Sequence, residues 1–597
     1  MGLSAGCKRK EGKVFLTKKN RKKVFPSLNK FVVILFALIL SLVVVAAFAD
    51  ENQLSLSPIS PEFQEYMDLV QARKAAKIVT AEGYYLGLIP APVDMRHTRG
   101  LSVIPEVERV FYPASYDLRT LGRVTSVKDQ GACGSCWAFA TYGSLESWLL
   151  GEEGITWDFS ENNLKNCHGF NWTGCEGGNR WLSTAYLARW DGPINEADDP
   201  YHAYEDACIP GLSEKKHLET VLFIPDRASS TDNDNIKQAV MNYGVMYTSM
   251  YYASSHYNAT NYTYYYSGAE YSNHAVAIVG WDDNFNKNLF NTPPAGNGAW
   301  IVRNSWGTTW GENGYFYISY YDSKSGRSNA SFINAEEPDD SIIYQYDPLG
   351  STTFAYVGGA GNTKWGANIF TATSNKRLTS VAFYTATVNT SYGVYIYDTF
   401  FGGSFSDLLG SKSGTITYPG YHTIDLDSSV RLTSGDDFAV VVKFTTPGYN
   451  WPIPIEYPIS GYSDAATANP GESYVSSDGT SWTDTTSIWS NTNVCIKAIA
   501  AIVLPSPDLT GIVVYPNPFE PAKGHTKVTF QALTEEVTIR IFTISGELVR
   551  KEELPFQYIW DWDGKNMNGE EVVRGVYIWV VTNAAGEKKA GRIAVLK

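Results

Sequence analysis

The chain has 597 residues, of which 44% are hydrophobic, and its 62 Asp and Glu outnumber its 48 Lys and Arg, giving a formal net charge of −14 at pH 7. This acidic balance argues against nucleic acid and anionic lipid as partners. The sequence has no P-loop, no dinucleotide loop, no zinc-spaced set of Cys and His and no long internal repeat. We therefore expect no cofactor, no metal site and no solenoid fold.

The first segment of the chain has the pattern of an export signal. Residues 1–30 contain ten Lys or Arg and a single acid, Glu11, and Phe31 to Ala49 is an uncharged apolar run that ends in Ala47-Phe48-Ala49. A basic leader, an apolar core and a small-residue cleavage site predict a signal peptide over residues 1–49. The alternative is an uncleaved membrane anchor, because about 20 apolar residues can span a bilayer.

Residues 50–110 follow this signal and favour a propeptide. A helix is predicted around Pro61 to Thr80, and the apolar run L-G-L-I-P-A-P-V-D comes after it. As a propeptide, the segment would cover a cleft until it is removed. The alternative is a plain N-terminal extension without that role.

The stretch from Gln130 to Phe139, Q-G-A-C-G-S-C-W-A-F, carries the strongest chemical signal. Cys136 stands between small residues and an apolar run, which indicates a thiol at the start of a buried helix. Only the thiolate attacks, and a free cysteine with a pKa near ~8.5 is mostly protonated at neutral pH. Because a helix N-terminus favours negative charge, this position suits a nucleophile.

A cysteine nucleophile needs a histidine that takes up its proton and later donates one to the leaving amine. Of the eight histidines, His274 has the fitting context, S-N-H-A-V-A-I-V-G-W, where the apolar run predicts a buried strand that begins at the ring. Asn304, in W-I-V-R-N-S-W-G, follows a second predicted strand and would orient the imidazole by a hydrogen bond. The polar piece between Trp281 and Trp300 is expected to be a surface insertion in a hairpin.

Attack on a peptide carbonyl creates an oxyanion, which needs hydrogen-bond donors. Gln130 can supply a side-chain amide beside the backbone N–H of Cys136. Loss of one such donor typically costs roughly 10²–10³ in turnover. Each of these residues alone could be an ordinary core residue, but four fitting contexts in one order favour catalysis.

These residues resemble the papain and cathepsin family of cysteine proteases, whose signature C-G-[SA]-C-[WY] reads Cys133-Gly134-Ser135-Cys136-Trp137 here. His274 follows Cys136 at a distance within the ~130–150 residues known for the family, and Asn304 lies beyond that window. The resemblance implies an α+β domain over residues 111–335, with a helical half that carries Cys136 and a β-rich, barrel-like half that carries His274. The Y-P-A-S-Y-D-L-R stretch from Tyr112 resembles the mature start of this family and implies processing shortly before it.

The cysteine pattern fits an exported member of that family. Four cysteines allow three pairings, so spacing alone chooses none of them. The resemblance implies the pairs Cys133–Cys175 and Cys167–Cys208, which leaves Cys136 free. An exported protein can form disulfides.

The resemblance also indicates a substrate cleft. Cys175-Glu176-Gly177-Gly178 matches the family's C-x-G-G, in which glycines let substrate backbone approach, although a simple turn is the alternative. Trp306 is expected to shield the His274–Asn304 hydrogen bond from water. We find no long insertion between Cys167 and Cys208 of the kind that blocks the cleft in dipeptide-removing relatives. Endopeptidase activity is therefore favoured.

Two all-β sandwich domains are expected after the protease. Residues 342–503 show short alternating runs separated by Gly, Ser, Asp and Pro, and resemble the lectin-like domain of bacterial family members. Tyr449 and Trp451 could stack on a sugar ring or close the core. Residues 504–597 comprise a Pro-containing linker and a unit with Asp-Gly and Asn-Gly turns, which resembles Ig-like C-terminal secretion or sorting domains of bacteria. It is either a sorting signal or a spacer.

The sequence thus predicts an exported cysteine endopeptidase that acts on peptides or proteins. A surface glycan is a possible partner through the lectin-like domain, and a membrane is one only if the N-terminal segment stays uncleaved. The alternative from another class is a cell-surface adhesion or glycan-binding protein whose protease domain is vestigial.

Overall fold

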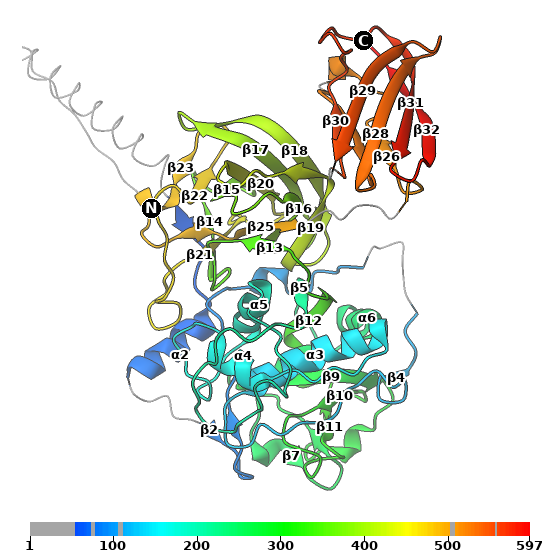
Figure 1. The fold of residues 1–597 in the computed structure, drawn as a ribbon. Coiled ribbons are helices and arrows are strands. Elements are labelled where there is room, and N and C mark those ends of the chain that lie inside the picture. The colour runs from blue at the N-terminus through cyan, green and yellow to red at the C-terminus, as the bar shows by residue number, and fades with distance from the viewer. Residues whose placement is uncertain (1–53, 73–77, 105–110, 502–507, 524, 556–557) are drawn as a thin grey trace, which may run out of the picture. The chain divides into compact units, whose positions relative to one another are not determined.

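The computed structural model describes residues 54–72, 78–104, 111–501, 508–523, 525–555 and 558–597 (Figure 1). The predicted signal peptide lies outside these residues. Within the part of the chain that is described, no helix combines the length and the apolar character needed to cross a bilayer.

The N-terminal segment (residues 54–104) is a chain of short elements. They are β1 (Ser55–Leu56), α2 (Pro61–Gln71), β2 (Ile78–Val79), β3 (Tyr85–Leu86) and the 3₁₀ turn η1 (Arg96–Thr98). The helix predicted around Pro61 to Thr80 is shorter than expected, because β-branched Ile78 and Val79 pair with β3 in a small hairpin.

The protease unit places its helices early in the chain. They are α3 (Cys136–Glu153), α4 (Glu161–Cys167), α5 (Arg180–Ala188) and α6 (Asp234–Tyr243). Helix α3 is buried over most of its length, and it ends at Gly154, whose φ of 69° only glycine adopts without strain. The side chain of Asn179 caps α5 by accepting hydrogen bonds from the N–H groups of Trp181 and Leu182.

The strands of the protease unit, most of which come after these helices in the chain, belong to one sheet (Figure 1). They are β4 (Ser115–Asp117), β5 (His217–Ile224), β6 (Met246–Met250), β7 (Tyr257–Asn258), β8 (Thr263–Tyr264), β9 (His274–Asp282), β10 (Ala299–Arg303), β11 (Tyr315–Ser319) and β12 (Arg327–Glu336). The 3₁₀ turns are η2 (Ser254–His256) and η3 (Lys287–Leu289). Strands β9 and β10 pair antiparallel, with Trp281 opposite Trp300, so residues 283–298 form the loop of a hairpin.

The second unit consists of strands, as expected from its short alternating runs. They are β13 (Ile342–Tyr344), β14 (Thr353–Tyr356), β15 (Thr363–Thr371), β16 (Arg377–Thr385), β17 (Thr390–Phe401), β18 (Ser404–Ile416), β19 (Gly420–Arg431), β20 (Asp437–Thr445), β21 (Ile453–Glu456), β22 (Ser473–Ser476), β23 (Thr483–Asp484), β24 (Asn493–Val494) and β25 (Ile496–Ala501). The 3₁₀ turn η4 covers Thr485–Ser487. Val381, Val440 and Ile496 lie in the core between its sheets.

The second unit continues the sheet of the protease unit. Strand β19 pairs antiparallel with β5, and Tyr421 lies opposite Val221. The N-terminal segment also enters the second unit, because β1 pairs with β14 as an edge strand. The two units therefore share backbone hydrogen bonds as well as side-chain packing.

The C-terminal unit is a small sandwich of two sheets. Its strands are β26 (Val513–Tyr515), β27 (Val528–Gln531), β28 (Glu536–Thr543), β29 (Leu548–Pro555), β30 (Trp560–Trp562), β31 (Gly575–Asn583) and β32 (Lys588–Val595), with η5 at Pro521–Lys523. One sheet has the order β26-β27-β30 and the other β29-β28-β31-β32. Trp562, Ile539 and Val581 fill the space between them. The expected fold class, a papain-like α+β unit followed by all-β units, is confirmed.

A buried cation holds the start of the protease unit together. The Lys128 ammonium lies 2.7–3.3 Å from the carboxylates of Glu146, Asp158 and Glu161, and it donates to the Phe159 carbonyl at 3.0 Å. Glu146 lies in the middle of α3 and Glu161 opens α4. Burial raises the pKa of Glu161, and the Lys128 ammonium opposes this by favouring the carboxylate. Lys128 thus ties two helices to the strand-like segment that leads to Gln130.

Replacement of Lys128 by Met should destabilise the protease unit. The change leaves Glu146 and Glu161 buried without a counter-charge, and breaking such a pair typically costs about 3–5 kcal/mol. We expect a lower urea midpoint for the loss of native tryptophan fluorescence. Lys588→Met, at an exposed position of β32, serves as the matched control. Equal midpoints for both variants would contradict a structural role for Lys128.

Candidate active site

Cys136 is the first residue of α3 and is buried without a disulfide partner. Its sulfur accepts a hydrogen bond from the backbone N–H of Ala275 at 3.4 Å. Ala275 follows His274 at the start of β9, so the helix that carries the thiol meets the strand that carries the imidazole.

Two disulfides frame the thiol. Cys133 is bonded to Cys175, and Cys167 to Cys208, which are the pairs that the family resemblance implied. The first of them joins the loop before α3 to the loop before α5. Cys495 is a buried free thiol in the second unit, as expected for a core residue.

His274 and Asn304 form a buried pair. The imidazole Nε2 lies 2.9 Å from Asn304 Oδ1, which requires the proton on Nε2 and leaves Nδ1 as the proton acceptor. Nδ1 has no hydrogen-bond partner among the described residues. Asn304 Oδ1 also accepts from the N–H of Ser305 at 2.9 Å, which fixes the amide orientation. Trp306 stacks on the imidazole with 4.8 Å between ring centroids and is fully buried, so it excludes water from this hydrogen bond.

The surroundings of Cys136 and His274 favour their neutral forms. Burial raises the pKa of Cys136 to about 11, although backbone N–H groups of Ala275 and Gly87 act in the opposite direction. Burial likewise lowers the pKa of His274 to about 4, opposed by the hydrogen bond to Asn304. At neutral pH this site therefore holds a thiol and an uncharged imidazole, and not an ion pair.

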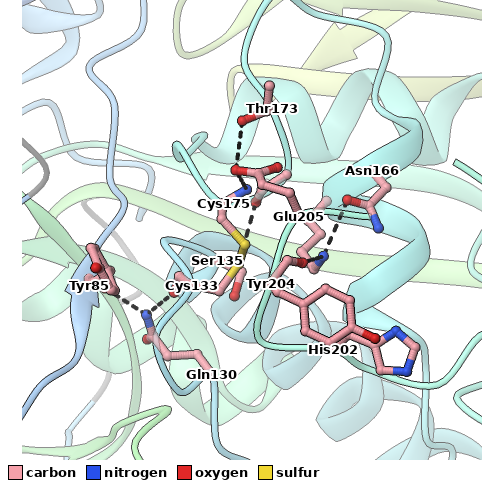
Figure 2. Close-up of a disulfide and its surroundings, with 12 residues drawn as sticks. Tyr85, Gln130, Cys133, Ser135, Asn166, Thr173, Cys175, His202, Tyr204 and Glu205 are labelled. Carbon is pink, nitrogen blue, oxygen red and sulfur yellow. Dashed lines mark hydrogen bonds between the residues drawn. A yellow bond between two sulfur atoms is a disulfide. The ribbon is translucent and has the colours of Figure 1, made fainter. Parts of the chain in front are cut away.

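Gln130 lies beside the thiol loop with its side-chain amide already engaged. Nε2 donates to the carbonyl oxygens of Tyr85 and Cys133, each at 2.8 Å, and Ser305 Oγ donates to Oε1 at 2.6 Å. Figure 2 shows the amide between these two carbonyls, next to the Cys133–Cys175 disulfide. The donor expected for an oxyanion thus holds a carbonyl of the N-terminal segment.

Gly177 and Gly178 lie beside the N-terminal segment where it passes Cys136. The space that this segment occupies is called the groove below. Gly178 lies against the Trp137 ring, where an added Cβ would come within 2.5 Å of ring carbon, so no side chain fits. Its N–H donates to the Gly87 carbonyl at 2.9 Å, and its carbonyl accepts from the Ile89 N–H at 3.0 Å. Gly178 therefore pairs with an extended strand, as the family motif predicts for a substrate.

That extended segment, residues 84–89, includes β3 and runs across the site. Gly87 packs so closely on Gly134 that an added Cβ would lie 1.8 Å from the Gly134 carbonyl oxygen. Leu88 donates to the Asn273 carbonyl at 3.2 Å, and Tyr84 stacks on Trp306 with 4.9 Å between centroids. No catalytic motif marks these residues in the sequence. The one available signal was Gly87 within an apolar run, in a segment already suspected of covering a cleft.

The N-terminal segment is held at both ends by the second unit. Ser55 and Leu56 pair with Tyr356 and Ala355 of β14. His97 stacks on Tyr449 with 3.9 Å between centroids, and its Nε2 lies 2.9 Å from the Ala386 carbonyl.

The aromatic residues considered for sugar stacking pack internally here. Tyr449 is buried beneath His97, and Trp451 packs against Tyr449 with 5.5 Å between their ring centroids. Trp181 is likewise buried, beside Phe223.

Three family models match the chain. They are the papain family cysteine protease over residues 112–334, the lectin like domain over residues 343–500 and the secretion system C-terminal sorting domain over residues 513–595.

Curated relatives match the protease part. Cathepsin L1 of Drosophila melanogaster is 33% identical over 225 residues, which cover 34% of this chain and 53% of that protein. Pro-cathepsin H of Mus musculus is 34% identical over 223 residues, or 35% of this chain and 60% of that protein. The chain spans less than two thirds of the length of these relatives.

Solved structures extend the similarity to the second unit. The cysteine protease and lectin-like domains of Cwp84, a surface layer associated protein of Clostridium difficile, superpose with a TM-score of 0.64 and 28% identity, covering 75% of this chain and 98% of that one. A variant of clostridial Cwp84 after propeptide cleavage gives a TM-score of 0.57 and 30% identity, with 65% and 99% coverage.

Alkylation of Cys136 should report the burial of the site. In the intact chain we expect slow reaction with iodoacetamide at pH 7 and a rate that rises toward the thiol pKa of about 11. Proteolytic removal of residues 54–104 exposes the sulfur, so its thiolate forms at lower pH and the rate at pH 7 rises at least about 100-fold. Mass spectrometry of the labelled peptides measures both rates. Cys495 stays unlabelled as an internal control, and an unchanged pH profile would contradict the role of burial.

Proposed function

Since this chain belongs to the papain family of cysteine proteases, we propose that it is an exported endopeptidase that is made as an inactive zymogen. The observation that carries this proposal is the buried meeting point of Cys136, His274 and Asn304, with Gln130 beside it. A carrier with a vestigial protease domain would have no need for four competent side chains in one groove.

The proposed reaction is acyl transfer from the peptide to Cys136. His274 Nδ1 takes the thiol proton, the thiolate attacks the peptide carbonyl, and the imidazolium then protonates the leaving amine. Water hydrolyses the resulting thioester with His274 as base. Gln130 and the Cys136 N–H would stabilise the oxyanion, and Asn304 would hold the imidazole in the required tautomer.

We propose that residues 50–110 act as the propeptide of this enzyme. The support is the position of residues 84–89, which take the hydrogen-bonding groups of Gly178, Asn273 and Gln130 that a substrate would need. The strand is a poor substrate itself. The Gly87 N–H is directed at the Cys136 sulfur, and the Gly87 carbonyl is bonded to Gly178 instead of facing the thiol.

Activation then requires a cut and the release of the segment. The expected cut lies shortly before Tyr112, where the side chain of Phe111 is fully exposed to solvent. A cut there leaves β1 paired with β14 and His97 stacked on Tyr449. The cleaved segment therefore stays attached to the lectin-like unit at two places. We infer that the cleaved segment dissociates slowly and remains inhibitory until it leaves.

The secretion system C-terminal sorting domain over residues 513–595 marks the protein as exported. Cell-surface retention is our proposal, by analogy with the surface layer associated Cwp84. For the lectin-like unit we propose glycan binding after activation, because release of the N-terminal segment would uncover Tyr449 and the neighbouring Trp451. Binding of cell-wall polysaccharide to the processed chain, but not to the intact chain, tests this second role.

A peptide reporter tests the protease assignment. The processed chain should hydrolyse the reporter, and both alkylation and Cys136→Ala should reduce the rate by at least about 10³-fold, because the nucleophile is lost. Cys495→Ala, at the buried thiol outside the site, is the matched control. Hydrolysis that survives alkylation would contradict Cys136 as the nucleophile. No hydrolysis, alongside tight glycan binding, would favour the adhesion protein.

Gly87→Val should weaken inhibition in the intact chain. The new side chain would collide with the Gly134 carbonyl, so residues 84–89 cannot seat in the groove. We expect reporter hydrolysis by the uncut variant at least about tenfold above that of the unaltered uncut chain, measured before any N-terminal fragment appears on a gel. Ala81→Val, at an exposed position of the same segment, should remain inactive. An inactive Gly87→Val chain that still labels slowly at Cys136 would refute the inhibitory role.

A further inference from the structure

A cavity of about 100 Å³ lies next to the groove, and its lining includes several charged side chains. The protease unit contributes Arg180 and Trp181 from the start of α5, Tyr247 from β6, Arg327 from β12, and Asp226. The N-terminal segment closes the other side with Leu88 and Ile89, among others. Departure of that segment therefore opens the cavity directly onto the strand position that pairs with Gly178.

Arg180 is the centre of this wall. Its side chain is buried, donates to the Asn329 carbonyl at 2.5 Å and lies 4.2 Å from the centroid of the Phe223 ring. Among the described residues, Arg180 makes no direct ion pair, and burial lowers its pKa to about 10, opposed mainly by the nearby charge of Asp226. Asp226 counters both Arg180 and Arg327, so the two guanidinium groups share one negative charge. Because Arg180 is buried and makes no direct ion pair, an added anion would be stabilised at this wall.

Two further groups face the same space. Tyr247 is fully buried, and its hydroxyl has no hydrogen-bond partner among the described residues. Arg327 donates only its Nε, to the Ser323 carbonyl at 3.0 Å, and has no ion pair in the described part of the chain. Asp226 is the one acidic wall residue of the protease unit, and one of its oxygens accepts the N–H of Ser328 at 2.8 Å. The protease side of the cavity thus carries two guanidinium groups and one hydroxyl but a single carboxylate, which is already hydrogen-bonded to Ser328.

The wall is built with local strain. Ser328 has a φ of 48°, in the left-handed region that a residue with a side chain seldom adopts. The hydrogen bond that the Ser328 N–H donates to Asp226 holds this conformation. It thereby sets the position of Arg327, the preceding residue.

The N-terminal segment already presents an acid to this wall. Glu62, in the first turn of α2, lines the cavity, and Lys324 and Arg327 are the positive groups that most favour its ionised form. Release of the segment removes Glu62 and leaves the wall with a net positive charge.

We propose that Arg180, Arg327 and Tyr247 select substrates with an Asp or Glu side chain at the position that pairs with Gly178. In the intact chain Leu88 holds this position, one residue from Gly87 at the sulfur. The acidic side chain is therefore on the residue adjacent to the one at the thiol. This inference rests on the proposed peptidase function and names its substrate class.

A pair of fluorogenic peptides tests the preference on the processed chain. They differ only by Glu or Gln at the residue adjacent to the one at the scissile bond, and we expect kcat/KM for the Glu peptide to be at least about tenfold higher. Arg327→Gln should lower this ratio about tenfold, Arg327→Lys should retain most of it, and Arg327→Glu should favour a Lys peptide. Arg431→Gln, at an exposed position of β19, is the matched control. Arg327 is partly exposed, so these variants are expected to fold.

Binding separates this inference from the proposed function. Fluorescence anisotropy of the same labelled peptides on processed Cys136→Ala measures recognition without turnover. Tighter binding of the Glu peptide that Arg327→Gln abolishes supports the pocket even if the processed wild-type chain cleaves no peptide. Cleavage with equal kcat/KM for the Glu and Gln peptides, unchanged by Arg327→Gln, overturns the acidic preference and leaves the peptidase assignment intact.

Discussion

The hydrogen bond from the Ala275 N–H to the Cys136 sulfur is the contact on which the rest of the site depends. It joins the first residue of α3 to the second residue of β9. The start of a helix and the start of a strand, from distant parts of the chain, thus meet at one point. The β9–β10 register adds Asn304, because Arg303 lies opposite Ala277 near the start of β9. An error of one residue in this register would turn Asn304 away from the imidazole.

In the proposed zymogen, the burial that brings the site together also keeps it inactive. Thiol and imidazole are both more stable uncharged in a dry groove, and their pKa values are shifted apart, to about 11 and about 4. An ion pair becomes favourable only when water or substrate replaces the covering strand. The inhibition that we propose therefore works through access and through electrostatics, and both effects come from residues 84–89.

In this proposal the lectin-like unit takes part in the control of the site. Its strand β14 receives β1, and its Tyr449 receives His97, so the covering strand is fixed at two places outside the protease unit. Its strand β19 also extends the protease sheet through β5. A unit that first suggests a binding module attached by a linker therefore contributes to the closed state of the enzyme, because backbone pairing across the units stabilises the seat of the N-terminal segment.

Local sequence patterns were enough to identify the candidate catalytic residues. The residues around Cys136, the apolar run after His274 and the strand before Asn304 each carry local signals, since nucleophile loops and strand ends have characteristic neighbours, and the all-β character of the later units follows from their alternating runs. Which residues face the groove became clear from the folded chain alone. The close approach of Gly87 to Gly134, the position of Glu62 near Arg327 and the burial of Arg180 beside Asp226 all depend on residues far apart in the chain, which no local pattern encodes. Tyr449 illustrates the same limit, because its aromatic ring suited either a sugar or the core, and the position of His97 is a property of the folded chain.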